Sequence, residues 1–297
     1  TGSVEKTGAN TLTLTNDQTY TGTTTIDGGI LALGNGGTAG SVTGDITNNG
    51  SLIFNRSDDV SYGGVIDGTG DLSKVNNNTV ILTGDSTYNG GTTISNGTLQ
   101  LGNGGVGGSI SGNIVNNAEL VFDRSDDLVY SNVISGTGNV EKIGTNTLTF
   151  VEDQTYTGTT TINDGSLELG NGGTSGSVNG DIANNGQVIF DRSDDIVYSN
   201  VINGTGSVDK ISGNILTFTE DQTYTGVTTI DAGTLSLGNG GISGSVSGNI
   251  TNNSALIFNR SDDIVYNNVI DGTGSVEKTG ANTLTLTNDQ TYTGTTT

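Results

Sequence analysis

We expect an all-β fold, a parallel β-helix built as a solenoid, from three features of the amino-acid sequence. A 68-residue unit recurs along the chain, short runs such as Thr11 to Leu14 alternate polar and apolar residues, and Gly, Asn or Asp separates these runs. Alternation is typical of strands with one buried face, and recurrence at a fixed period is typical of stacked coils. No segment has the apolar period of a helix, so strands and turns are the only elements expected.

The repeat is marked by the tetrapeptide Arg-Ser-Asp-Asp, which begins at Arg56, Arg124, Arg192 and Arg260 and so returns with a constant period. Residues 1–25 also return letter for letter at 273–297, four periods later. One continuous solenoid over 1–297 is therefore expected, and its mid-repeat ends suggest a fragment of a longer chain. It comprises four repeats, at approximately 5–72, 73–140, 141–208 and 209–276, and a partial fifth.

Each repeat contains three related sub-units, as in 11–29, 30–50 and 51–78. Every sub-unit has a short strand, a turn, a second strand and another turn. Their average of about 23 residues is that of one β-helix coil and is short for a propeller blade of about 40 to 45 residues. The sequence thus predicts about three coils per repeat, with antiparallel hairpins of a propeller as the alternative.

Two positions of the repeat exchange only apolar residues between copies, and a third is always Phe. Because Leu52 and Phe54 are two residues apart, both should point to the same face of a strand. We expect the phenylalanines to stack in the core at three-coil intervals. The three sets are Val60, Leu128, Ile196 and Ile264; Leu52, Leu120, Val188 and Leu256; and Phe54, Phe122, Phe190 and Phe258.

Three polar or amphipathic positions also recur. All nine Tyr occupy two repeat positions, represented by Tyr20 and Tyr62, and are expected to cover the edge of the core with wet hydroxyl groups. The Asn pairs, such as Asn48 and Asn49, suit turns with positive φ. One Lys per repeat is expected to face water and to discourage sideways strand pairing. These are Lys6, Lys74, Lys142, Lys210 and Lys278.

Composition excludes several classes of protein. The 31 acidic and 9 basic residues give a formal charge of −22, which would repel nucleic acid and anionic membranes and attract cations. The absence of Cys excludes disulfides and suits an extracellular protein. No apolar run is long enough for a membrane-spanning helix, and residues 1–4 do not resemble a signal peptide, so any export signal is expected outside this segment.

Paired Asp residues follow each repeated Arg-Ser and are the strongest candidates in the sequence for a catalytic or metal-binding role. Glycoside hydrolases use a pair of carboxylates for catalysis. Neighbouring residues of a strand, however, point to opposite faces, and a catalytic site normally occurs once in a chain and not in every repeat. We therefore predict no catalytic or cofactor-binding residues and no enzyme activity. Calcium is the alternative ligand, because it prefers several oxygens, and a solvated turn is the favoured interpretation. The calcium candidates are Asp58, Asp59, Asp126, Asp127, Asp194, Asp195, Asp262 and Asp263.

One half of each repeat resembles the autotransporter passenger-associated β-strand repeat. The resemblance rests on the run from Lys6 to Leu14, on Tyr20 to Gly22, and on Thr23 to Gly34. It is closest in the second copy, where Tyr88 precedes Gly-Gly-Thr-Thr-Ile and then Gly-Thr-Leu. The Arg-Ser-Asp-Asp half lies outside this pattern. The resemblance implies a right-handed β-helical passenger of a Gram-negative adhesin, exported through a C-terminal barrel that this segment lacks.

These observations predict a structural stalk or fibre of a bacterial surface or secreted adhesin that serves adhesion, autoaggregation or biofilm formation. Its expected partners are copies of itself, other cell-surface components or glycans, and its expected location is extracellular. No nucleic acid is expected to bind, and a membrane would be reached only through a barrel or anchor outside the segment. A carbohydrate-binding or carbohydrate-cleaving fibre like a tailspike, or an envelope-layer protein, is the alternative.

Overall fold

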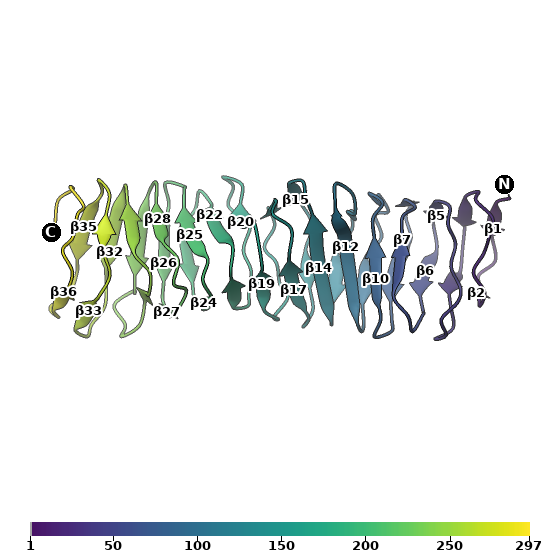
Figure 1. Ribbon diagram of the computed structural model, residues 1–297, viewed down its shortest axis with the longest axis horizontal. Coiled ribbons are helices and arrows are strands. Elements are labelled where there is room, and N and C mark those ends of the chain that lie inside the picture. Colours follow the sequence, from purple (N-terminus) through teal and green to yellow (C-terminus); the bar gives the residue numbers. More distant parts are fainter. Residues whose placement is uncertain (1) are drawn as a thin grey trace. The chain divides into compact units, whose positions relative to one another are not determined.

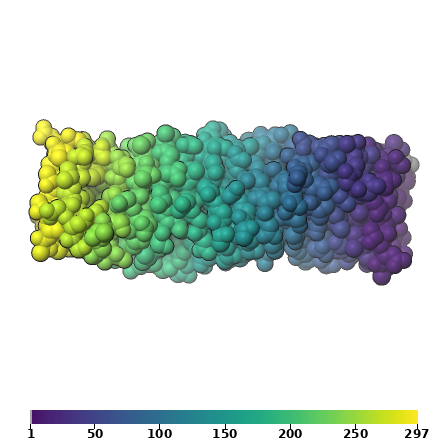
Figure 2. All heavy atoms as spheres, turned by 90° about the horizontal axis from the view of Figure 1, so that it is seen from below, coloured from purple at the N-terminus to yellow at the C-terminus, as the bar shows by residue number. Residues whose placement is uncertain are grey.

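A computed structural model describes residues 2–297, which form strands and turns and contain no helix that could span a bilayer. The chain divides into two compact units. Unit 1 comprises residues 2–146 and 154–158, and unit 2 comprises residues 147–153 and 159–297. Within each unit the strands run side by side in successive coils (Figure 1), and the atoms form a closely packed surface in the view of Figure 2.

Unit 1 is a parallel β-solenoid with three strand-bearing sides. Its first sheet contains β1 (Val4–Lys6), β3 (Thr24–Ile26), β5 (Ile46–Asn48) and β8 (Ile66–Asp67). The second contains β2 (Thr11–Leu14), β4 (Ile30–Leu33), β6 (Ser51–Phe54), β9 (Asp71–Lys74), β11 (Thr92–Ile94), β13 (Ile114–Asn116) and β16 (Ile134–Ser135). The third contains β7 (Val60–Tyr62), β10 (Thr79–Leu82), β12 (Thr98–Gly105), β14 (Glu119–Arg124) and β17 (Asn139–Lys142). Strand β15 spans Leu128–Tyr130.

Unit 2 is a parallel β-solenoid of the same kind. One sheet contains β18 (Thr147–Phe150), β20 (Ser166–Gly170), β22 (Gln187–Asp191), β25 (Ser207–Lys210), β28 (Thr228–Ile230), β31 (Ile250–Asn252) and β34 (Ile270–Asp271). A second contains β23 (Ile196–Tyr198), β26 (Ile215–Phe218), β29 (Thr234–Leu237), β32 (Ala255–Phe258) and β35 (Ser275–Lys278). The remaining strands are β19 (Thr160–Ile162), β21 (Ile182–Asn184) and β24 (Ile202–Asn203), then the pair β27 (Asp221–Gln222) and β30 (Ser245–Val246), and the pair β33 (Ile264–Tyr266) and β36 (Leu284–Leu286).

Strand pairing confirms the predicted parallel solenoid and not the hairpins of a propeller. Neighbouring strands are parallel throughout each unit, and most paired residues are 19 to 22 positions apart, as in the pairings of Thr11 with Ile30 and of Thr92 with Ile114. The pair β27 and β30 is longer, with Asp221 opposite Ser245. Most coils are therefore shorter than the average sub-unit length of about 23 residues expected from the sequence.

The repeat does not contain a whole number of coils. Starting from Thr11, the ladder passes through Ile30 and Ser51 and reaches Asp71 after three coils. The repeat-equivalent of Thr11 is Thr79, which lies in β10 on the next side of that coil. A repeat thus occupies three coils and one further side, so the predicted three coils are too few by one side. Each copy is turned by one side relative to the preceding copy within a unit.

This rotation of each repeat by one side changes the expected packing of the core. The inward stripe is confirmed for Leu52 and its equivalents, which are fully buried. In the second predicted set Val60, Leu128 and Ile196 are only half-buried, and Ile264 alone is buried. Phe54 and Phe122, however, belong to different sheets of unit 1, so repeat-equivalent phenylalanines do not stack. Phe54 instead pairs in register with Leu33 and Lys74, and the centroid of its ring lies 6.2 Å from that of Tyr62 in an edge-on arrangement.

Candidate functional site

The repeated Arg is a clamp that holds three coils together. Arg56 follows β6 and is 8% exposed. Its Nη1 lies 2.8 Å from Asp17 Oδ1, its Nη2 lies 2.7 Å from Asp58 Oδ2, and Nη2 also donates to the Thr38 carbonyl at 2.5 Å. Because Asp17, Thr38 and Arg56 are separated by about one coil each, the guanidinium ties two earlier coils to its own.

The same arrangement recurs in the other repeats. Each Arg binds the first Asp that follows it, an Asp two coils earlier and a carbonyl one coil earlier. Hydrogen bonds from the guanidinium lower the pKa values of Asp58, Asp194 and Asp262. The other clamps join Arg124 to Asp85, Val106 and Asp126; Arg192 to Asp153, Thr174 and Asp194; and Arg260 to Asp221, Ile242 and Asp262.

The second Asp of each pair has a different partner. Asp59 Oδ1 accepts a hydrogen bond of 2.7 Å from the Thr79 amide in the next coil. Asp195 and Asp263 accept equivalent bonds from the amides of Ile215 and Thr283. Asp127 occupies this position in the second repeat. Within residues 2–297, no group of three or more His, Cys, Asp or Glu side chains is gathered as a metal site. The first Asp of each pair thus bonds the Arg of its own coil, and the second Asp joins its coil to the next.

Four of the five repeated lysines are buried, contrary to the expectation that they face water, and Lys278 is half-buried. Lys74 is fully buried, and its Nζ donates to the carbonyl groups of Asn76 and Asn96, in successive coils. Lys210 Nζ binds Asn214 Oδ1 at 2.7 Å and the Ala232 carbonyl at 3.2 Å. Burial lowers the pKa of Lys74 and of Lys210 to about 8. Each ammonium group caps backbone carbonyls that would otherwise be buried without a donor.

The tyrosines and the Asn pairs also differ from expectation. Tyr88 is fully buried, and its hydroxyl group lies 2.6 Å from Thr92 Oγ1, so it is not wet. Among residues 2–297 only Gly residues have positive φ, so the paired Asn residues do not supply left-handed turns. Asn48 is fully buried instead, and its Nδ2 donates to the Asp71 carbonyl of the next coil at 2.9 Å.

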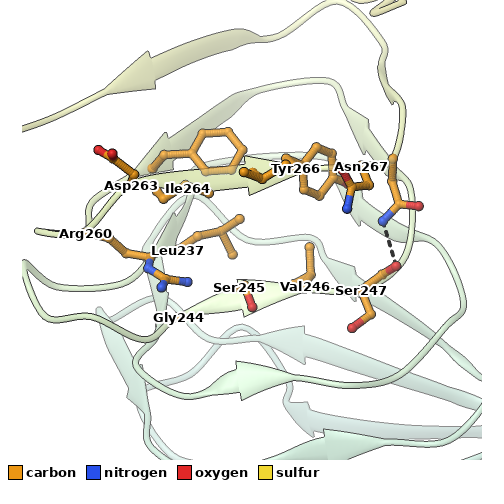
Figure 3. A pocket seen from close by; sticks show the side chains of 13 residues that line it. Leu237, Gly244, Ser245, Val246, Ser247, Arg260, Asp263, Ile264, Tyr266 and Asn267 are labelled. Atoms are coloured by element: carbon orange, nitrogen blue, oxygen red, sulfur yellow. Dashed lines mark hydrogen bonds between the residues drawn. The ribbon is translucent and has the colours of Figure 1, made fainter. Parts of the chain in front are cut away.

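A groove opens where the ladder between two coils is interrupted. Strand β30 pairs with β27 on one side, and β33 pairs with β36 on its far side, but no pairing joins β30 to β33 within the described residues. The resulting hollow has a volume of about 550 Å³ and is lined mainly by 244–247 and 263–268. Tyr266 spans the interruption and donates from its hydroxyl group to the Gly248 carbonyl at 2.7 Å. Figure 3 shows the serine hydroxyls, Asp263 and Asn267 around this groove.

The groove is repeated in unit 1. There, a hollow of about 300 Å³ lies between 109–111 and 128–132, which are repeat-equivalent to the lining of the groove in unit 2. Tyr130 crosses it and donates to the Gly112 carbonyl at 2.9 Å. Outward valines stand on the same strands, with Val129 and Val265 being 56% and 61% exposed. The sequence signal for this feature was the Gly-Asn-Gly-Gly loop, which interrupts the strand alternation before each groove.

Comparison with known proteins identifies the strand-rich half of each repeat. The passenger-associated-transport-repeat family matches residues 4–33, 72–101, 140–169, 209–237 and 276–297. The repeated lysines from Lys6 to Lys278 fall inside these segments, whereas the four clamp arginines and the grooves lie largely between them.

A curated relative points the same way. Over 191 residues, the chain is 36% identical to a protein named Adhesin BmaC autotransporter, from Brucella suis biovar 1 (strain 1330). This alignment covers 57% of the chain and 6% of the relative, so the chain spans only a small part of that protein's length. No solved structure matches the chain significantly. The resemblance to autotransporter passengers is confirmed, and the chain carries five passenger-associated-transport-repeats.

Proposed function

We propose that this chain is part of the structural stalk of a bacterial adhesin, exposed at the cell surface or secreted, and that it has no enzyme activity. The observation that supports this role most strongly is that the repeated charged side chains bind groups of neighbouring coils. Each arginine clamp and each buried lysine contacts backbone or carboxylates of neighbouring coils, so these side chains stabilise the stacking of the coils. The similarity to an adhesin autotransporter supports the location.

Surface display of the complete reading frame tests the stalk role. Removal of one 68-residue repeat should bring the distal end of the fibre closer to the cell by about 16 Å, the rise of three and one-third coils at about 4.8 Å each. Electron microscopy of labelled cells measures this spacing for chains with one, two or three repeats removed. A distal end whose distance from the cell does not depend on repeat number would contradict the proposal.

We also propose that stalks associate laterally when cations reduce their repulsion. The charge of −22 keeps copies apart at low salt, and calcium or high ionic strength screens it. Light scattering of the purified chain with calcium, with magnesium and with sodium chloride at equal ionic strength separates specific calcium binding from screening. An identical monodisperse species under all conditions would reject lateral association.

A further inference from the structure

The interrupted ladder leaves backbone groups directed into the groove. In a parallel strand, alternate residues bond to opposite neighbours, and the amide of Ile264 donates to the Thr283 carbonyl in the following coil. The amide and carbonyl groups of Val265 therefore point the other way, toward Val246. Within the described residues, neither Val246 nor Val265 has a backbone partner across this gap. Because Val246 is only 4% exposed, its backbone amide and carbonyl groups can bond only to water or to a polar ligand that enters the groove.

The side chains of the groove offer neutral hydrogen-bonding groups. Ser245, Ser247 and Asn267 lie around it (Figure 3). The side-chain amide of Asn268 donates to the Ser247 carbonyl at 2.7 Å. The one cationic group among the residues that line it, Arg260, is already bound to Asp262, Asp221 and the Ile242 carbonyl. An anionic ligand would meet Asp263 and the acidic surface, so the groove favours a neutral, hydroxyl-rich ligand.

We propose that each such groove binds a neutral saccharide, whose hydroxyl groups bond to the unpaired backbone of the two coils and to the serine and asparagine side chains. The volumes of about 300 and 550 Å³ lie in the range of small-molecule sites. An added peptide strand fits less well, because the short strand β33 directs only one amide and one carbonyl group into the groove. The inference goes beyond the stalk role, since it assigns a ligand class to a specific place in the repeat.

Binding at one groove should be weak. The ring of Tyr266 is 5% exposed and cannot offer its face to a sugar, which removes the stacking that strengthens many saccharide sites. Repetition raises the avidity, because a flexible polymeric glycan that binds one of the two grooves has a higher effective concentration at the other. The ligand class is therefore best tested with short saccharides, and the gain from repetition with longer ones.

The test is a titration of the full chain, followed by NMR and calorimetry, with cellotriose, maltotriose, chitotriose and lactose as probes. At least one probe should bind at two or more sites. Ser247→Trp should remove one site, and Ser111→Trp together with Ser247→Trp should remove two, because both side chains are exposed at the groove mouths. Asn203→Trp, on an exposed position outside the groove, is the matched control and should leave the number of sites unchanged.

Two results would overturn the inference. One is the absence of saturable binding by any of the four saccharides, and the other is binding that persists unchanged in the double groove variant. Binding of the capped peptide acetyl-Val-Thr-Val-amide in place of the saccharides would also reject the ligand class. Fibre length measured on cells that carry the double variant separates the two proposals: loss of saccharide binding with unchanged length leaves the stalk role intact.

Discussion

Asp17 and Arg56 form an ion pair of 2.8 Å between side chains that lie two coils apart, and the carbonyl of the intervening coil binds the same guanidinium. Three coils are thus held by one side chain. A planar group with five donors suits this task, since its partners lie in different directions around its plane.

The geometry of the clamp predicts that Lys cannot replace Arg. Arg124→Lys keeps the charge but presents one ammonium group to Asp85, Asp126 and the Val106 carbonyl, so at least one contact is lost. We expect the Tm to fall by about 2 to 4 °C, as for a loss of roughly 1 kcal/mol in a unit of this size. Calorimetry of Arg124→Lys beside Arg124→Ala distinguishes lost geometry from lost charge. A Lys variant as stable as the parent would show that charge alone suffices.

Close stacking of glycines predicts a second destabilising change. A methyl group at Gly90 would overlap the carbonyl oxygen of Gly70 in the preceding coil, whereas a methyl group at Gly105 would meet nothing within 4 Å. Gly90→Ala should cost about 1 to 3 kcal/mol, typical of overpacking. Gly105→Ala serves as the control and should be neutral. Urea denaturation measures both, and equal stability of the two variants would contradict this account of coil packing.

The buried lysines predict that stability rises with pH in the alkaline range. In the folded chain the pKa of Lys74 and of Lys210 is about 8, below the ordinary value of 10.5, so the unfolded chain binds more protons between these limits. The free energy of unfolding therefore increases as pH rises from about 8 toward 10, by something on the order of 1 kcal/mol per lysine.

Tyrosine sets the upper limit of this window. Burial raises the pKa of Tyr88 and Tyr224, so the folded chain retains their protons above pH 10 and loses stability there. Urea denaturation at intervals from pH 7 to pH 11 should show a maximum near pH 10. The double variant Lys74→Met and Lys210→Met should show a smaller rise. A parent chain whose stability falls steadily from pH 8 would refute the assignment of buried lysines.

The register of the ladder predicts which deletions the fold accepts. Removal of 73–140 joins Leu72 to Glu141 at equivalent places in the repeat, so every strand finds a partner of the expected pattern. Removal of the half-repeat 73–106 joins a strand to the glycine-rich loop and should disrupt the following coils. Hydrogen exchange and Tm compare the two chains. Equal protection in both would mean that repeat phase does not govern pairing.

Much of the fold is predictable because the alternation of inward and outward side chains along a strand depends only on the local sequence. Leu52 and Phe54 alternate with more exposed neighbours and are buried as expected. The same rule predicts burial of Lys74, since it lies two residues after Leu72 in β9, but the charge of Lys favours the opposite expectation. The residue becomes tolerable inside only because turn carbonyls from two coils meet its ammonium group, and that meeting depends on the coil length.

The groove and the rotation of each repeat by one side were not predictable, because both depend on the exact length of a coil. Coil length is set by how tightly the turns close. The coil length expected from the sequence is slightly too large, and over one repeat this excess adds up to the residues of one whole side. Tyr266 could be recognised as a recurring aromatic residue, but its role in spanning an interrupted ladder requires the register of β30 and β33. The Gly-Asn-Gly-Gly loop precedes the grooves but occurs in every repeat, so this local pattern alone does not tell which coils fail to pair.

Since one repeat overshoots three coils by one side, tandem duplication within either unit does more than add length. Each new copy of a loop is rotated by one-third of a revolution about the axis of its unit from the preceding copy, so near-identical loops face different directions. Two successive copies within one unit therefore present the same loop in different directions, so a flat surface that touches one side of the unit meets only one of them.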